Sequence, residues 1–325
     1  MSHQSQSEGV GRLGRYAALA LGCVLFVMSL VVLASSHRLD QLPFVVILIS
    51  QPAMILSVVL IGIRLAMLFP NGARPYRSAV SATFIGGGFG IMLPFRAGEA
   101  LKLLVLRKQT GTKISTLLGV ILLERAGDVL VLAFFGTIVL LGKTNLDQLL
   151  ILVIFVVCFL FVRPIGKSVG LFLKGQAHTT AQSAGEWIRT ASSRCTARGL
   201  AWSSLTSLPG QALAVGVALV VMHAIAPEET TVRAGIALWF GAAIGLGLSL
   251  APAGLGTFEA GGTAALMALG WPLETALEAT VSLHIAYLIT LAPIGGLLVG
   301  FQVPSFFRPR ARTLEEIRRE DQSTE

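Results

Sequence analysis

Two segments that combine a proline, glycines and charge interrupt otherwise apolar sequence, one in each half of the chain. The first, MLPFRAGE at residues 92–99, contains Pro94, Arg96 and Glu99. The second, APAGLGTFE at residues 251–259, contains Pro252, Gly254, Gly256 and Glu259. Broken helices expose backbone groups that are tolerated at membrane depth only against protein or water. Breaks at corresponding positions of two halves therefore indicate a transporter-like binding site near the bilayer midplane.

Charged residues cluster around the first break. Arg96, Glu99 and Lys102 follow one another at i, i+3 and i+6, so that Glu99 can pair with either neighbour. A charge within an apolar segment costs about 2.5–3.5 kcal/mol and persists when it is paired or lines a wet cavity. Because helix N-termini after the breaks also favour anions, a lipid phosphate is a natural ligand for this region.

A second charged group, Glu124, Arg125 and Asp128, lies within an apolar stretch. Glu124 and Asp128 at i, i+4 share one helix face and would repel each other unless a cation intervenes. We expect Arg96, Lys102 and Arg125 to contact phosphate, while the carboxylates orient the arginines, bind a basic headgroup or carry coupling protons. The alternative is that these ion pairs only orient helices.

Several other residues have two interpretations. Glu259 could belong to the site or merely cap the helix that follows it. His284 and Tyr287 share one face of the last apolar segment and form either a proton relay or ordinary packing. Arg64, near one end of its segment, is expected to extend its charge to the membrane surface. The glycines at 86–88 and 90 predict close helix packing.

Composition places the chain among all-α polytopic membrane proteins. Of its 325 residues, 54% are hydrophobic and 13% are charged, and the mean hydropathy is +0.76. Soluble proteins carry about 25% charged residues. The three cysteines are scattered without metal or disulfide spacing, and no cofactor is indicated. The net charge of +8 brackets the apolar segments, which is not a nucleic-acid signature.

The apolar pattern predicts six spans and two broken units. The spans cover about 14–36, 43–69, 114–141, 149–173, 200–226 and 275–302, the first of them long enough to act as a retained signal anchor. The broken units cover 78–108 and 232–270. We expect a tail at 1–13, a transmembrane domain at 14–302 and a second tail at 303–325.

The distribution of basic residues predicts the orientation. If both termini are cytoplasmic, 18 of the 25 lysines and arginines fall inside and three outside, the remaining four lying within apolar segments. Residues 14–142 and 147–302 then have the same order of elements in opposite orientations. Each half contains three spans and a broken or re-entrant helical hairpin, which is the inverted repeat of many secondary transporters.

Three motifs, LPFRAGE at 93–99, ERAGD at 124–128 and APAGLGTFE at 251–259, resemble the lysylphosphatidylglycerol synthase transmembrane region. The resemblance implies a flippase-like domain that moves lipids between leaflets. Bifunctional members also carry a soluble aminoacyltransferase domain. Because this chain ends soon after its last span, we expect a stand-alone member that does not make aminoacylated lipid. The implied substrates are varied and include polyprenyl-linked glycans.

We therefore expect a flippase-like transporter of the bacterial inner membrane that moves a phosphate-bearing amphiphilic lipid. Its partner would be a membrane lipid with an anionic headgroup, and no nucleic acid. One alternative is an intramembrane lipid-modifying enzyme that uses Glu124 and Asp128 as acid and base. Another is a non-transporting partner of a membrane glycosyltransferase or other lipid-modifying enzyme. Common hydrolase, zinc-protease and nucleotide-binding motifs are absent from the sequence, and its longest polar stretch is too short for a soluble catalytic domain.

Overall fold

The computed structural model describes residues 43–92, 97–140, 196–248 and 251–302, together with a few positions between 168 and 193. Within these ranges the regular structure is helical. In chain order it comprises α2 (Phe44–Met67), η1 (Pro70–Gly72), α3 (Tyr76–Met92), α4 (Ala97–Thr110), α5 (Ile114–Leu140), α8 (Ala197–Ile225), α9 (Val232–Leu248), η2 (Pro252–Gly254), α10 (Thr257–Met267) and α11 (Leu273–Gln302).

Three of the described helices are long and apolar enough to cross a membrane. They are α2 with 24 residues, α8 with 29 and the part of α11 from Leu273 to Val299 with 27. α5 is as long as the last of these but contains the three charges of the ERAGD motif. Within the described residues, the all-α membrane class expected from composition is therefore confirmed.

Local sequence explains where several helices begin and end. Thr196 caps α8, its hydroxyl accepting a hydrogen bond from the Gly199 N–H at 3.1 Å. α9 stops before the APAG sequence, where Pro252 opens the single turn η2. α10 begins directly after Gly256, which has a φ of 78°, a conformation that favours glycine. Residues 93–96, between α3 and α4, lie outside the described ranges.

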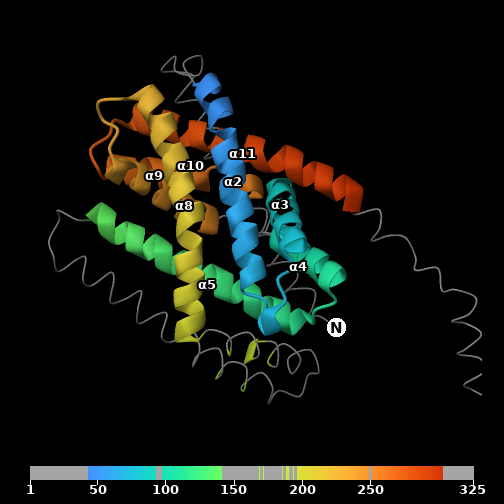
Figure 1. Ribbon diagram of the computed structural model, residues 1–325. Helices are drawn as coiled ribbons and strands as arrows, with labels where there is room; N and C mark the ends of the chain where they lie inside the picture. Colours follow the sequence, from blue (N-terminus) through green and yellow to red (C-terminus); the bar gives the residue numbers. More distant parts are fainter. Residues whose placement is uncertain are drawn as a thin grey trace, which may run out of the picture.

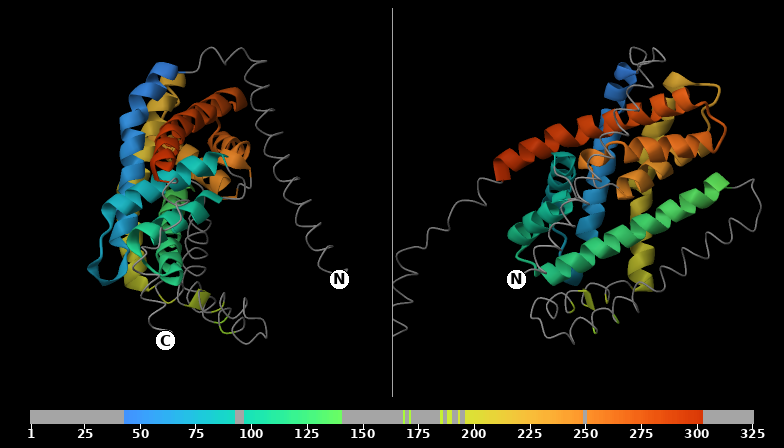
Figure 2. Two further views of the ribbon diagram at one scale, coloured as in Figure 1. Left: turned by 90° about the vertical axis from the view of Figure 1, so that its right-hand side faces the viewer. Right: turned by 180° about the vertical axis from the view of Figure 1, so that it is seen from behind.

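The helices form two hairpins that pack between longer helices (Figures 1 and 2). α3 packs on α4, and α9 packs on α10. α2 and α8 lie side by side, while α11 and α5 run obliquely across them. α11 contacts the first hairpin through α3, and α5 contacts the second hairpin through α9. Each hairpin is therefore enclosed partly by helices from the other half of the chain.

Glycines set the distance between some of these helices. A Cβ added to Gly88 of α3 would lie 2.6 Å from the Leu291 carbonyl oxygen and 2.7 Å from the Gly295 Cα, both in α11. Gly86 is close to Lys102 and the Gly98 carbonyl oxygen in α4. The close packing expected of the glycine run is thus confirmed at residues 86–88.

The predicted elements agree with the described helices to within a few residues. The spans expected at 43–69, 114–141, 200–226 and 275–302 correspond to α2, α5, α8 and α11, and both broken units are pairs of helices. The spans predicted at 14–36 and 149–173 and both tails lie outside the described ranges or almost entirely so. The division of the chain into domains stays a prediction.

Candidate functional site

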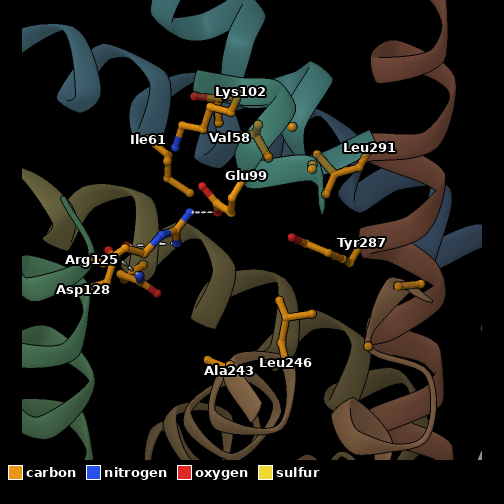
Figure 3. Close-up of a pocket in the computed structure, with 18 of the residues that line it drawn as sticks. Val58, Ile61, Glu99, Lys102, Arg125, Asp128, Ala243, Leu246, Tyr287 and Leu291 are labelled. Atoms are coloured by element: carbon orange, nitrogen blue, oxygen red, sulfur yellow. Dashed lines mark hydrogen bonds and ion pairs between the residues drawn. The ribbon is translucent and has the colours of Figure 1, made fainter. Parts of the chain in front are cut away.

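A cavity of about 250 Å³ lies where the two hairpins meet (Figure 3). Gly98, Glu99 and Lys102 of α4 line one side, and Ala253 and Gly254 of η2 line another. The remaining walls come from α2, α3, α5, α8, α9 and α11. The described parts of both broken segments therefore contribute to a single cavity, although more than 150 residues separate them in the chain.

Arg64 of α2 is the cation between the two acidic residues of α5. Its guanidinium contacts Asp128 in bidentate fashion, with Nη1–Oδ1 at 2.5 Å and Nη2–Oδ2 at 2.9 Å, and Nη2 lies 3.4 Å from Glu124 Oε1. Arg64 is 1% exposed. The expectation that its side chain reaches the membrane surface is wrong, because two carboxylates on the facing helix provide a buried partner. The repulsion that the i, i+4 spacing predicts between Glu124 and Asp128 is therefore relieved by the guanidinium of Arg64.

Lys102 and Glu124 form a second buried ion pair. Lys102 Nζ donates to both carboxylate oxygens of Glu124, at 2.8 and 3.1 Å. Glu124 has no exposed surface and Lys102 is 2% exposed. A buried lysine and a buried carboxylate are each costly alone, so this pair joins α4 to α5.

Arg125 and Glu99 form the ion pair that remains open to the cavity. The Arg125 Nη2 donates to Glu99 Oε1, and the two side chains are 44% and 38% exposed. Arg125 Nη1 also lies 3.6 Å from Asp128 Oδ2. Figure 3 shows Arg125 from one side and Tyr287 of α11 from the other pointing toward the centre, where Glu99 lies. This pair is more accessible to a ligand than the two buried pairs.

Polar residues of α8 and α9 that sequence reasoning did not select complete the site. Ser207 donates to Asp128 at 2.7 Å, and Gln211 Nε2 lies 3.3 Å from the same oxygen. The amide oxygen of Gln211 accepts from the Trp239 indole N–H at 2.5 Å. The signal was available, since Ser207 and Gln211 flank Pro209 within an apolar helix. Their importance depends on facing Asp128, which no local pattern reveals.

The tip of the second hairpin has a strained backbone. Ala253 adopts a φ of 59°, which costs a residue with a side chain of order 1–3 kcal/mol. Its carbonyl oxygen lies 3.0 Å from His284 Nε2, and His284 Nδ1 lies 2.5 Å from Glu259 Oε1. The other oxygen of Glu259 accepts from the Gly256 N–H at 2.7 Å. Glu259 therefore caps α10, as one interpretation of the sequence proposed, and also binds His284.

The structure thus brings most of the predicted site residues into two connected groups. Glu99, Lys102, Glu124, Arg125 and Asp128 form the ionic group, together with Arg64. Glu259 and His284 form the group behind the second tip, whose Ala253 and Gly254 line the cavity. Pro252 opens η2, and Gly256 precedes α10. Pro94 and Arg96 lie outside the described residues, so their predicted roles stay predictions.

A family model identifies the chain independently of this geometry. The model for the lysylphosphatidylglycerol synthase TM region matches residues 16–295. No curated protein and no solved structure matches the chain. The matched range covers most of the sequence and contains both broken segments and all of the ionic group. The chain belongs to the lysylphosphatidylglycerol synthase transmembrane-region family and is a membrane protein.

Proposed function

We propose that this protein moves a phosphate-bearing amphiphilic lipid, a phospholipid or a polyprenyl-linked lipid, between the leaflets of the bacterial inner membrane. The headgroup would occupy the cavity between the hairpins while the tails remain in the bilayer. The observation that carries the proposal is the half-exposed ion pair of Arg125 and Glu99 inside a cavity formed by both hairpins. The family, named for a lipid-modifying protein, supports a lipid-related role.

The charged side chains of the site differ in how accessible they are to a ligand, and this difference suggests different roles. Arg64 and Lys102 are buried and already paired with Asp128 and Glu124. Arg125 is the more exposed cation and has five N–H donors in a geometry that suits phosphate. The phosphate would replace Glu99 as the ion-pair partner of Arg125, while the buried pairs fix the position of α5. Arg96 remains a second proposed phosphate contact, and Lys102 a third if its pairing changes.

The pattern of helix packing supports the proposed inverted repeat. Exchanging α2 with α8, α3 with α9, α4 with α10 and α5 with α11 maps the α2–α8 contact onto itself and each other main contact among these helices onto another observed contact. For example, α3–α11 becomes α9–α5, and α2–α11 becomes α8–α5. Such a relationship favours two alternative arrangements of similar energy around one site, as alternating access requires. Cytoplasmic termini follow from the distribution of basic residues.

The rival enzymatic function has less support. It needs Glu124 and Asp128 as acid and base, yet Glu124 is fully buried against Lys102 and Asp128 is bidentate to Arg64. A group that donates or abstracts a proton must reach the reacting atoms within about one hydrogen bond or one water. Carboxylates committed to buried cations are suited to structure rather than to catalysis.

A liposome assay tests the proposal. Purified protein is reconstituted with a fluorescent phospholipid, and the fraction of label accessible to a membrane-impermeant quencher is followed over time. The protein should accelerate exchange between leaflets, and Arg125→Gln should slow it by about tenfold or more, because a charge-assisted contact to phosphate is lost. A panel of polyprenyl-phosphate lipids extends the same measurement to the second substrate class.

Arg198→Gln is the matched control, since it removes an exposed arginine from the start of α8, outside the cavity. Its exchange rate should equal that of the wild type. If no lipid of a broad panel moves faster with protein than without it, the transport function is incorrect. Product formation from a lipid, detected by mass spectrometry and abolished by Asp128→Asn, would favour the enzyme instead.

A further inference from the structure

His284 and Glu259 form a buried pair directly behind the wall of the cavity. His284 is 1% exposed and so is Glu259, and the ring of Phe258 stacks on the imidazole with 4.2 Å between centroids. Both ring nitrogens have partners: Nδ1 lies 2.5 Å from Glu259 Oε1, and Nε2 lies 3.0 Å from the Ala253 carbonyl oxygen. The ion pairs of the proposed lipid site do not involve either residue.

The partners of the imidazole determine how many protons the pair contains. A carbonyl oxygen only accepts, so Nε2 must carry hydrogen and donate to Ala253. Nδ1 then faces a carboxylate oxygen at 2.5 Å, and two lone pairs at that distance would repel each other. A second proton must therefore lie between Nδ1 and Oε1, either on the imidazole or on the carboxyl. In both forms the pair is neutral overall and holds one proton that it can release.

The same proton is connected to the shape of the hairpin tip. Ala253 has a φ of 59°, and its carbonyl accepts from His284 while the residue itself lines the cavity. If the proton leaves, Glu259 remains as a carboxylate and the neutral imidazole prefers to donate to it from Nδ1. Nε2 then carries no hydrogen, and its lone pair faces the Ala253 carbonyl oxygen. This contact becomes repulsive, and the strained tip loses the bond that opposes its relaxation.

We propose that the His284–Glu259 pair is a proton-binding site whose occupancy controls the tip of the second hairpin. Release of the proton to the cavity removes the bond to Ala253 and lets the tip move, and rebinding of the proton restores the closed tip. The proton site itself does not depend on the proposed lipid transport. Its role does rest on that proposed function, since the site would couple passage of the headgroup to proton movement.

The other titratable groups near this site are already engaged or more distant. On α11 itself, Tyr287 lies beyond Phe258, with ring centroids 6.3 Å apart, and Glu278 is buried two turns earlier. From the helices packed around it, Arg64 of α2 binds Asp128, and Arg233 of α9 donates to the Val139 carbonyl. α3 has Tyr76 and Arg77 at its start, and α8 has Arg198 and His223 in its terminal turns. Among the described residues, Glu259 is thus the carboxylate shown in contact with His284.

Hydrogen exchange measured by mass spectrometry tests the inference on the purified full-length protein. Protection factors for the backbone amides of residues 251 and 253–256, corrected for intrinsic exchange, are compared between about pH 5 and about pH 8, the range in which histidine side chains of proteins can change charge. In the wild type, protection should fall as pH rises, by about tenfold or more, the change expected when a hydrogen bond to a charged group is lost. Wild-type protection that is independent of pH overturns the proposal, whatever the variants do.

Glu259→Gln is the informative variant because it keeps the geometry without a releasable proton. The glutamine oxygen can accept from the Gly256 N–H, and its amide can donate to His284 Nδ1, which preserves the Nε2 bond to Ala253. The tip of this variant should stay protected at every pH. Glu278→Gln, which neutralises another buried carboxyl group of the same region, should retain the wild-type response. A response that persists in Glu259→Gln, or disappears in Glu278→Gln, contradicts the assignment.

The readout separates the inference from the proposed function. Exchange at the tip is measured without any lipid substrate, so a response of the tip supports the proton site even if no lipid is translocated. Conversely, lipid exchange in liposomes together with an unresponsive tip leaves the transport function standing and removes the proton site. In liposomes, Glu259→Gln should also abolish the dependence of the lipid exchange rate on pH.

Discussion

Arg64 of α2 and Asp128 of α5 form a bidentate ion pair at 2.5 and 2.9 Å, although 64 positions separate them in the chain. Arg64 is almost fully buried, and Asp128 also accepts from Ser207 of α8. The carboxylate of Asp128 therefore connects the three helices α2, α5 and α8. In an apolar environment such a network gives a defined relative position to helices that van der Waals packing alone would leave free to shift.

Arg64→Leu should strongly destabilise the protein. Asp128 would keep only its hydrogen bonds and the longer contact with Arg125 at 3.6 Å, and breaking a buried pair costs about 3–5 kcal/mol. The apparent melting temperature in detergent should fall clearly below that of the wild type. Arg64→Leu combined with Asp128→Leu should be less destabilised than the single variant, because no uncompensated charge remains. Equal melting temperatures for the wild type and Arg64→Leu would show that the pair contributes little.

Lys102→Met should reduce the yield of folded protein because it leaves Glu124 fully buried, with Arg64 at 3.4 Å as its nearest remaining cation. Adding Glu124→Gln should restore much of the yield, since the isosteric amide carries no charge. Size-exclusion chromatography of a fluorescent fusion measures the monodisperse fraction. A double variant no better than Lys102→Met would mean that the lysine acts through packing rather than through its charge.

Glu99→Gln and Arg125→Gln should change lipid binding in opposite directions. Glu99 competes with phosphate for the Arg125 guanidinium, so neutralising Glu99 should increase the retention of an anionic phospholipid, and neutralising Arg125 should decrease it. Native mass spectrometry of protein released from mixed micelles measures the bound fraction. Because both side chains are more than one-third exposed, neither change should greatly alter stability. A decrease in both variants would place the phosphate elsewhere.

Gly88→Ala should lower the melting temperature because its Cβ would lie 2.7 Å from the Gly295 Cα and separate α3 from α11. Gly216→Ala is the matched control, since a Cβ at this position of α8 would meet no atom within 4 Å. That change should be neutral or stabilising by up to about 1 kcal/mol, as expected for alanine in a helix interior. Thermal unfolding of the two variants side by side checks the prediction. Equal losses would indicate a general sensitivity to added methyl groups.

Much of the secondary structure could be predicted because its causes are local. Apolar runs of about 20 residues specify membrane helices, and Pro252 with the neighbouring glycines specifies an interruption that any tertiary context must accommodate. The ends of α5 and α11 were accordingly placed within a few residues. The i, i+4 spacing of Glu124 and Asp128 likewise predicted that a cation must approach that face. These conclusions need only the periodicity of a helix and the cost of burying charge.

The identity of each charge's partner could not be read in this way. The sequence suggested that Glu99 pairs with Arg96 or Lys102, its neighbours along the helix. In the folded chain Lys102 binds Glu124 and Glu99 binds Arg125, while Arg96 lies outside the described residues. Arg64 near the end of its helix was expected at the membrane surface, yet it is the cation that Glu124 and Asp128 require. Pairing energies of buried charges depend on distances of a few ångströms between helices that are remote in sequence. Only the packing of α2, α4, α5 and α8 sets those distances, and it thereby decides that Arg125 rather than Arg64 faces the cavity.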